Sequence, residues 1–390
     1  MTNFIPLAKP DIGEEEINLI IETIKSGWLT TGPKVTEFEK ELNNYLQHKK
    51  PLYSVGLNSC TSALFLALIA LDIKKGDEVI VPTWTFAATA QVVEWVGATL
   101  ILCDIEKETL NIDIKQAEQL ITKKTKAIIP VHMAGFPCDM EGIASLAKKY
   151  NLKIIEDAAH AIGTKYRDIK IGNFSDITCF SFYATKNLAM GEGGAAVSHN
   201  REIIEKIRKL SYFGINKESS DRYTKKGKWF YDIGGLGYKC NLDSIHAALG
   251  LVQLQKLDDM NQKRRKIANY YRKNISKNIK CFFDSADYYH TYHLFPIYLP
   301  ENIDRDDFIE KLKDKNIGAS VHFIPLHKHS FYKERFKNQH FHVAENMYKY
   351  TLSIPMCSAQ TIEEAEYIID TINTLVDHQF SNSNSIKVIQ

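Results

Sequence analysis

The sequence lacks several features that mark other classes of protein. Its 49 Lys and Arg residues nearly balance 47 Asp and Glu residues, and no stretch concentrates basic side chains as a nucleic-acid footprint requires. The most apolar stretch, residues 63–71, is about half as long as a bilayer span. The N-terminal segment has no basic stretch followed by an apolar one, as a secretory signal would have. We therefore expect a cytoplasmic protein that neither binds nucleic acid nor inserts into a membrane.

Metal-binding and nucleotide-binding patterns are also missing. The seven cysteines are scattered, odd in number and without CxxC spacing, which argues against a disulfide framework and a structural zinc site. We expect free thiols and no bound metal. Neither GxGxxG nor GxxxxGK[ST] occurs, which weakens dinucleotide-binding and P-loop interpretations. The hydrophobic fraction of 44% excludes disorder as the main state, and 390 residues allow two or three domains.

What the sequence does contain is an alternation of short apolar runs and longer segments of helical periodicity. The expected strands cover residues 52–55, 78–81, 99–103, 127–131, 153–155, 177–182 and 195–198. The expected helices between them include residues 61–71, 86–96 and 140–150. Most of these strands are too hydrophobic to be half exposed, as expected when helices cover both faces of a parallel sheet. The sequence therefore predicts an α/β fold with a mainly parallel seven-stranded sheet.

The pattern changes after residue 235. A long helical region at 243–274 precedes an expected strand at 290–299, a helix at 305–315, a strand at 319–323 and a helix at 362–376. A small α+β domain fits this order. The predicted organisation is an N-terminal arm (1–12), a large α/β domain (13–255), a small C-terminal α+β domain (256–379) and a flexible tail (380–390).

Two clusters of chemically active residues follow expected strands. Lys186 lies in SFYATKNLAMGEGG, where a buried strand ends before a glycine-rich turn. Asp157 and His160 lie in IIEDAAHAIGT, directly after another strand. The carboxyl ends of parallel strands are where α/β proteins bind ligands. The alternatives are that Lys186 is a solvated surface lysine and that Asp157 caps the next helix.

Two further clusters complete the set. In LNSCTSALFLAL, a helix opens with Ser59, Thr61 and Ser62, whose hydroxyls and backbone N–H groups would suit a phosphate. In PTWTFAATA, Trp84 and Phe86 follow a strand, although most aromatic side chains are core residues. A lysine, an aspartate, a phosphate cup and an aromatic ring at one sheet edge are the parts that pyridoxal phosphate needs.

With these residues in place, the sequence resembles the DegT/DnrJ/StrS family of PLP-dependent nucleotide-sugar aminotransferases. Eight motifs in order carry the resemblance: GWLTTGPK (27–34), NSCTSAL (58–64), GDEVIVPTWTF (76–86), KTKAIIPVHMAG (124–135), EDAAHAIGT (156–164), SFYATKNLAMGEGG (181–194), GYKCNLDSIHAALGLVQL (237–254) and IGASVHFIPLH (317–327). The resemblance implies an aspartate-aminotransferase-like fold, PLP fold type I, with a large and a small domain. EDAAHA and GEGG are most similar to the family members that aminate C4 of a sugar.

The resemblance implies roles for individual residues. Lys186 would bind the cofactor covalently and move protons, and Asp157 would pair with the pyridine nitrogen. The other implied cofactor contacts are Cys60, Thr61, Phe86, Ala159, His160, Ser181 and, from the second subunit, Lys239. The implied substrate or cross-subunit contacts are Trp28, Thr30, Thr31, Tyr183, Arg222, Asn241, His322 and His327.

The implied activity is transfer of the amino group of L-glutamate to a 4-keto nucleotide sugar, for lipopolysaccharide or O-antigen biosynthesis. Pyridoxamine 5'-phosphate would be the intermediate form of the cofactor, and the enzyme would be a homodimer with shared active sites. Two positions depart from the pattern: Tyr183 replaces a common His, and Cys240 replaces a common Tyr. The alternatives are a 3-keto sugar aminotransferase and a non-catalytic regulator of the same fold. Lys186 argues against the dehydratases of the family, which have His there.

Overall fold

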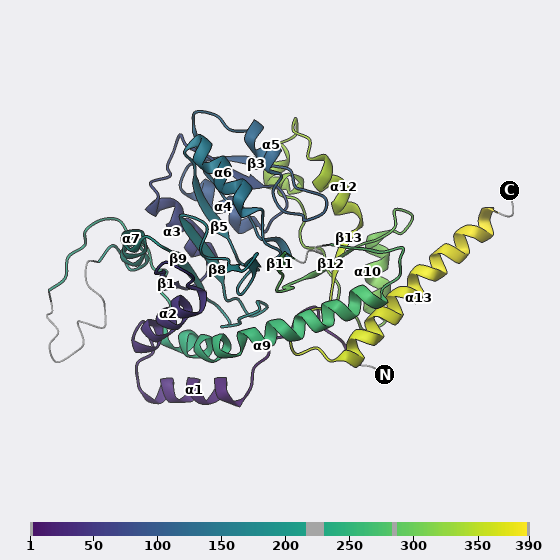
Figure 1. Ribbon diagram of the computed structural model, residues 1–390, viewed down its shortest axis with the longest axis horizontal. Coiled ribbons are helices and arrows are strands. Elements are labelled where there is room, and N and C mark those ends of the chain that lie inside the picture. Colours follow the sequence, from purple (N-terminus) through teal and green to yellow (C-terminus); the bar gives the residue numbers. More distant parts are fainter. Residues whose placement is uncertain (1–2, 216–229, 283–286, 388–390) are drawn as a thin grey trace.

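The computed structural model describes residues 3–215, 230–282 and 287–387, and a seven-stranded sheet lies at its centre (Figure 1). The order of the strands is β1-β9-β8-β5-β4-β2-β3. Their bounds are β1 (Tyr53–Leu57), β2 (Glu78–Pro82), β3 (Thr99–Cys103), β4 (Thr125–Ile128), β5 (Lys153–Asp157), β8 (Ile177–Ser181) and β9 (Gly194–Ser198). Only β9 runs antiparallel to its neighbours, β1 and β8. The mainly parallel seven-stranded sheet is therefore confirmed.

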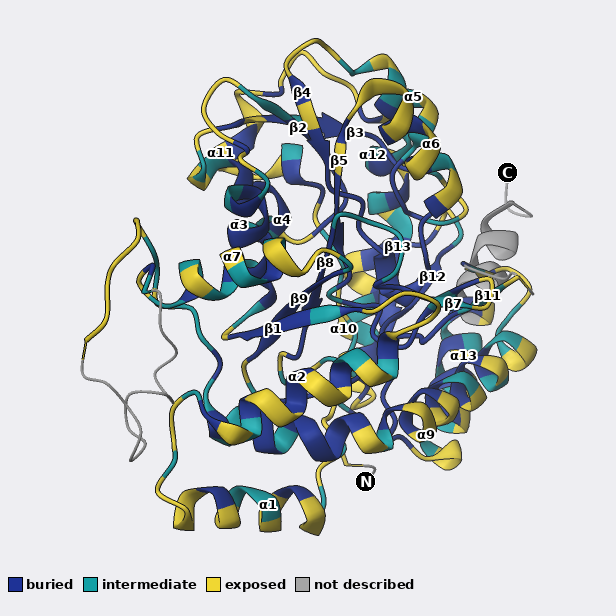
Figure 2. Cartoon of the chain, turned by 60° about the vertical axis from the view of Figure 1, so that its left-hand side comes forward, coloured by how far each residue is buried: buried dark blue, intermediate teal, exposed yellow. Residues whose placement is uncertain are grey.

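Helices cover both faces of this sheet, as the buried strands require. One face packs on α2 (Pro33–Leu46), α6 (Met140–Tyr150) and the first half of α9 (Ser244–Asn274). The other packs on α3 (Cys60–Ala70), α4 (Ala87–Trp95) and α7 (Arg201–Ser211). Consecutive residues of β2 alternate between the two cores, with Val79 and Val81 in one and Ile80 in the other. Figure 2 shows the buried strands between helices whose exposed faces point outward.

A third, smaller core surrounds the sheet β10-β12-β13. Leu257 and Met260 of α9 pack in the large core, and Ile267 and Tyr271 pack in the small one, so this helix joins both parts (Figure 1). From the N-terminal arm, Ile5 is buried in the small core. The bounds of these elements are β10 (Lys280–Cys281), β12 (Phe295–Tyr298), α10 (Arg305–Asp314), β13 (Thr351–Ile354) and α13 (Ile362–Lys387).

The remaining elements complete the described chain. They are α1 (Glu14–Lys25), α5 (Ile114–Gln119), η1 (Met133–Gly135), β6 (Lys165–Tyr166), β7 (Ile169–Lys170), β11 (Tyr288–Tyr289), η2 (Leu326–Lys328), α11 (Ser330–Lys333) and α12 (His342–Tyr350). Three of them, β11, β6 and β7, form a small separate sheet.

The C-terminal part differs from the expected elements in three places. Residues 319–323 form no strand, because only Ser320 pairs with β13 before the segment crosses to the end of β2. The strand expected at 290–299 shortens to β12, since Tyr292 has a positive φ of 46° and turns the chain. The last helix continues past residue 376 to Lys387, so the expected loose tail is helical up to that residue. Its Ser and Asn residues favour turns and caps, which hid the extension.

Candidate active site

A cavity of about 600 Å³ lies at the carboxyl ends of β2, β5 and β8. Ten of the predicted site residues line it: Cys60, Thr61, Phe86, Asp157, Ala159, His160, Ser181, Tyr183, Lys186 and His322. The N-terminal arm and the part of the chain after α9 also reach the cavity, because Leu7, His293 and Phe323 contribute to its lining. The position is the one where open parallel sheets bind ligands.

Lys186 is held in the turn that follows β8. Its backbone N–H donates to the carbonyl of Tyr183 (2.8 Å), and Ala184 N donates to the carbonyl of Gly191 (2.9 Å). Burial lowers the pKa of Lys186 to about 8, against the opposing attraction of the Asp157 carboxylate. Lys186 is therefore not a solvated surface lysine, and its neutral amine is available as a nucleophile or base near neutral pH.

This lowered pKa gives a prediction for the cofactor-free protein. In competitive labelling with an amine-selective reagent, Lys186 should be half reactive at a pH of about 8, whereas exposed lysines reach this point near pH 10.5. The direction follows from burial, which disfavours the ammonium and frees the amine at a lower pH. Mass spectrometry of the labelled peptides would measure it, with the exposed Lys149 as internal control; the hydrogen bond with Glu118 raises the pKa of Lys149, so it should reach half reactivity above pH 10.5. A midpoint for Lys186 near pH 10.5 would contradict the buried placement.

The glycine-rich turn after Lys186 also lines the cavity, through Glu192 and Gly193. Gly191 has a φ of 83°, which favours glycine. A Cβ on Gly194, the first residue of β9, would lie 2.4 Å from the backbone nitrogen of Cys60. Only glycine at this position lets β9 pass directly beside the start of α3.

Asp157 ends β5 with a side chain that is buried and oriented by two donors. The Thr89 hydroxyl donates to Oδ2 (2.7 Å), and the Ala159 N–H donates to Oδ1 (3.1 Å). Thr85, which lines the cavity, bonds the Thr89 hydroxyl in turn (2.8 Å). Burial raises the pKa of Asp157, and these hydrogen bonds and Lys186 offset part of that rise. No helix begins between Asp157 and α7, so the helix-cap interpretation is wrong.

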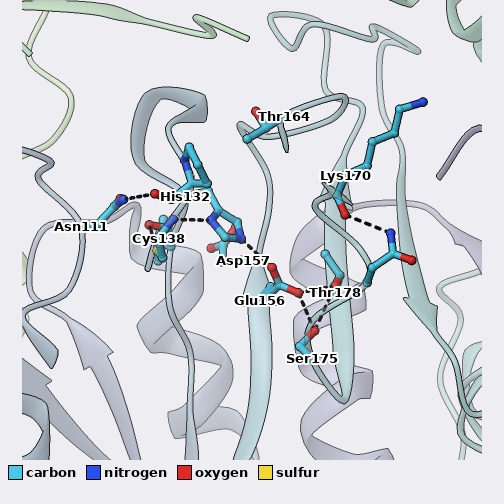
Figure 3. A network of polar contacts seen from close by, with 12 residues as sticks. Asn111, His132, Cys138, Glu156, Asp157, Thr164, Lys170, Ser175 and Thr178 are labelled. Atoms are coloured by element: carbon cyan, nitrogen blue, oxygen red, sulfur yellow. Dashed lines mark hydrogen bonds and ion pairs between the residues drawn. The ribbon is translucent and has the colours of Figure 1, made fainter. Parts of the chain in front are cut away.

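A buried network supports the main chain behind Asp157 (Figure 3). The Glu156 carboxylate accepts hydrogen bonds from Ser175 (2.6 Å) and Thr178 (2.7 Å). His132 Nδ1 accepts from Cys138 N, so Nε2 carries the proton and donates it to Glu156 (2.7 Å). His132 N donates to the Asp157 carbonyl (3.2 Å). The network therefore holds the end of β5 in place from the side opposite the Asp157 carboxylate.

The start of α3 is the place where the sequence predicts an anion site. The Ser59 side chain caps the helix by accepting from Ser62 N (3.1 Å), and the Ser62 hydroxyl donates to Asn58 (2.7 Å). These two hydroxyls thus take part in the hydrogen bonds of the helix cap, and Ser59 also lines the cavity. The N–H groups of Cys60 and Thr61 open the helix, where no intrahelical carbonyl reaches them. With the helix dipole and the Thr61 side chain, they suit a bound phosphate.

Aromatic and imidazole rings form the remaining walls. Phe86 is 61% exposed at the cavity and lies 5.7 Å from the Phe323 ring. Trp84 belongs to the core instead, and its Nε1 donates to the His322 carbonyl (2.9 Å). Trp84 is therefore a core residue, as most aromatic side chains are. The ring centres of His160 and His293 lie 4.3 Å apart with their planes inclined by 34°, and burial lowers the pKa of both, so both are neutral.

Five predicted residues form a second cluster outside this cavity. The Asn241 side chain donates to the Thr31 hydroxyl (2.6 Å), and Trp28 Nε1 donates to the Thr31 carbonyl (3.0 Å). Lys239 Nζ donates to Asn241 and lies 4.5 Å from the centre of the Tyr212 ring. The Thr30 carbonyl accepts from Ser244. Lys239 therefore does not face the cavity of its own subunit.

Two further predicted residues lie elsewhere. His327 bonds the Thr83 hydroxyl (2.7 Å) and stacks on Phe341 (4.5 Å), so it packs beside the end of β2 and does not line the cavity. Arg222 lies outside the described residues.

Two further findings apply to residues 3–215, 230–282 and 287–387. No three His, Cys, Asp or Glu side chains in this part of the chain are close enough to hold a metal ion. Within the same residues, none of the helices combines the length and hydropathy of a membrane span.

Together, a mainly parallel sheet, a buried lysine and aspartate at its strand ends and a helix start open to an anion define a PLP-dependent enzyme of fold type I. The model of the DegT/DnrJ/EryC1/StrS aminotransferase family matches residues 10–373, and the chain belongs to this family. It is a PLP-dependent sugar aminotransferase.

Individual relatives agree with this assignment. The chain is 43% identical to the spore coat polysaccharide biosynthesis protein SpsC of Bacillus subtilis, over 96% of this chain and 97% of SpsC. The PMP form of the putative sugar aminotransferase Spr1654 from Streptococcus pneumoniae has a TM-score of 0.89 at 34% identity, covering 96% of this chain and 100% of Spr1654. Helicobacter pylori PseC, an aminotransferase involved in the biosynthesis of pseudaminic acid, has a TM-score of 0.89 at 27% identity, covering 96% of this chain and 100% of PseC.

The residues present fit pyridoxal phosphate. The cavity combines a lysine with a lowered pKa, a carboxylate that is already oriented by two donors, and free N–H groups at a helix start. His160 Nδ1 is buried without a partner in the described structure, as expected for a group that awaits a ligand.

Proposed function

We propose that this protein transfers the amino group of L-glutamate to the C4 ketone of a nucleotide-linked 4-keto sugar. The products are 2-oxoglutarate and a 4-amino-4-deoxy sugar nucleotide, and the reaction takes place in the cytoplasm. The observation that carries the proposal is the position of Lys186, which shares one cavity with Asp157 and the start of α3. The motifs EDAAHA and GEGG support C4, and they are similar to those of UDP-4-amino-4-deoxy-L-arabinose–oxoglutarate aminotransferase.

The proposed roles follow from the chemistry of each residue. Bound pyridoxal phosphate supplies a ring that withdraws electrons and makes a substrate C–H bond acidic. Lys186 would hold the cofactor covalently and, when its amine is free, would move the proton at the substrate carbon. The Asp157 carboxylate keeps the pyridine nitrogen protonated. The N–H groups of Cys60 and Thr61 hold the phosphate.

The other cavity residues would place the cofactor ring and the substrates. Phe86 and Ala159 would contact opposite faces of the ring, and Ser181 would contact the phosphate. His160 would lie near the phenolic oxygen. The sugar nucleotide would contact Tyr183 and His322, both of which line the cavity. We withdraw His327 from this set, because it packs against Thr83 and Phe341.

We further propose a homodimer in which Lys239 reaches the phosphate of the partner subunit. Lys239 lies outside its own cavity, and Leu236, three residues before it, is 81% exposed. Phe230, Ile233 and Phe213 are also exposed, so large apolar side chains surround this region. Such a group of exposed apolar side chains marks a protein interface. Trp28, Thr30, Thr31 and Asn241 would then also serve the neighbouring site.

The proposed function is tested with the purified protein. Glutamate should bleach the absorbance of the lysine-linked cofactor and release one equivalent of 2-oxoglutarate per site. Addition of 4-keto and 3-keto sugars linked to UDP, dTDP or GDP should then restore the absorbance with the matching 4-keto substrate. Failure to react with glutamate would leave a non-catalytic protein of this fold. Restoration by 3-keto sugars alone would establish the alternative, a 3-keto sugar aminotransferase.

Replacement of Asp157 gives a prediction for the proton on the cofactor. Asp157→Asn should lower the turnover rate by about 100-fold or more, because an amide does not hold a proton on the pyridine nitrogen. The ¹⁵N chemical shift of the pyridine nitrogen would report the lost proton directly. Thr89→Val is the companion variant, since it removes only the hydroxyl that orients the carboxylate, and we expect a loss of about 3-fold to 30-fold. A rate for Asp157→Asn within about 3-fold of the wild type would refute the role of the carboxylate.

A further inference from the structure

His293 lines the cavity but belongs to none of the predicted contacts. It follows the turn at Tyr292, and only 5% of its surface is exposed. Two main-chain hydrogen bonds fix its position: its N–H donates to the Ala134 carbonyl (2.9 Å), and its own carbonyl accepts from Arg264. The ring packs against His160, with the ring centres 4.3 Å apart and the planes inclined by 34°. His293 is therefore a rigid part of the cavity wall.

The hydrogen bonds of Asn187 determine which ring nitrogen of His293 carries the proton. The Asn187 amide nitrogen donates to Asn261 Oδ1 (2.8 Å) and to the Thr291 carbonyl (3.0 Å), which uses both of its hydrogens. The Asn187 oxygen therefore faces His293 Nδ1 at 3.2 Å as an acceptor. Nδ1 must carry the proton that this bond requires. Rotating the amide by 180° would lose both other bonds.

The second ring nitrogen, Nε2, is then a lone-pair acceptor. The imidazole is neutral because burial lowers its pKa well below the usual value, and the nearby Lys186 acts in the same direction. In the described structure Nε2 makes no hydrogen bond, and it is not fully buried. Because His293 lines the cavity, a ligand in the cavity can reach this nitrogen. The site thus presents a rigid hydrogen-bond acceptor to whatever ligand binds.

From this acceptor we infer that His293 Nε2 binds a hydroxyl group of the sugar substrate; the inference rests on the proposed function and adds a specificity contact to it. Glutamate is a poor partner for Nε2, because its two carboxylates are acceptors and its amine is the reacting group. Among the substrates, the sugar ring carries hydroxyl groups that can donate a hydrogen bond and take no part in the amino transfer. A site built around such a bond rejects sugars that lack the hydroxyl, because the buried acceptor would stay unpaired.

The test compares the two half-reactions in three variants. His293→Phe keeps a ring beside His160 but removes the acceptor, and we expect the KM for the sugar to rise about 10-fold or more, equivalent to one lost hydrogen bond. The rate of the glutamate half-reaction should stay within about 3-fold, since no donor of glutamate uses this nitrogen. His293→Gln restores an acceptor and should recover much of the affinity. His340→Phe, at an exposed histidine, is the matched control.

Two further measurements, ligand binding and turnover of a substrate analogue, test the contact independently. Calorimetry of the amino-sugar nucleotide on the cofactor-free protein should show the same loss of affinity for His293→Phe. With a sugar that lacks the recognised hydroxyl, wild type and His293→Phe should have equal KM values. Two results for His293→Phe would refute the contact but not the proposed function, provided that the wild type turns over normally. They are equal losses of rate in both half-reactions and an unchanged KM for the sugar. Absence of wild-type turnover with every sugar tested would refute the proposed function, and the contact with it.

Discussion

Replacement of Lys186 by alanine should abolish turnover, with a loss of about 10⁴-fold or more, because no other amine among the described residues lines the cavity to bind the cofactor and move the proton. The absorbance of the lysine-linked cofactor should disappear, while pyridoxal phosphate should still bind through Asp157 and the start of α3. Fluorescence titration of the cofactor and a steady-state assay with glutamate would measure both effects. The spectrum separates loss of the covalent link from loss of binding.

The control is a lysine of the same chain with no place in the site. Lys149→Ala removes an exposed lysine paired with Glu118 and should leave the rate within about 2-fold, because exposed ion pairs contribute little. Adding methylamine to Lys186→Ala should restore a part of the proton transfer, since a free amine can enter the cavity of about 600 Å³. Near-normal turnover of Lys186→Ala would disprove the whole mechanism.

The central sheet could be predicted because its signal is local. Most of its strands are short apolar runs. Val79 to Val81 and Ile177 to Phe180, for example, can be recognised as strands from their own residues, without the rest of the chain. The segment 319–323 has the same apolar character but forms only one bridge, at Ser320, because its neighbours draw it to the end of β2. There, Leu326 N donates to the Thr83 carbonyl. Such a contact joins residues far apart in the sequence, and no local pattern contains it.

In the candidate site, too, the residues with a local sequence signal could be predicted, and those that depend on distant contacts could not. Lys186 and Asp157 stand at strand ends within clear motifs, and the structure brings both into one cavity. Thr89 was missed, although its spacing of four residues from Thr85 places both hydroxyls on one side of the start of α4. His293 was missed because its meaning depends on Asn187, 106 residues away in the sequence. The direction of a side chain relative to a distant partner is set by tertiary packing.

The position of Lys239 leads to the second large effect. Its side chain contacts Asn241 and the Tyr212 ring and does not line its own cavity, so in the proposed dimer it would act on the phosphate of the neighbouring subunit. Lys239→Glu should lower activity by about 30-fold or more, because a carboxylate would oppose the bound phosphate. The cofactor affinity should fall with it, which equilibrium dialysis would measure. This loss alone does not say which subunit Lys239 serves.

Mixing two inactive variants answers that question. When Lys186→Ala and Lys239→Glu subunits exchange at equal amounts, half of the dimers are mixed, and one of the two sites in each combines an intact Lys186 with an intact Lys239 of its neighbour. Activity should therefore return to about a quarter of the wild-type value. The matched control mixes Lys186→Ala with Asp157→Asn, whose residues line one cavity, so every site remains damaged and no activity should return. If subunit exchange is proven by mass spectrometry and the first mixture stays inactive, Lys239 does not serve the partner's site.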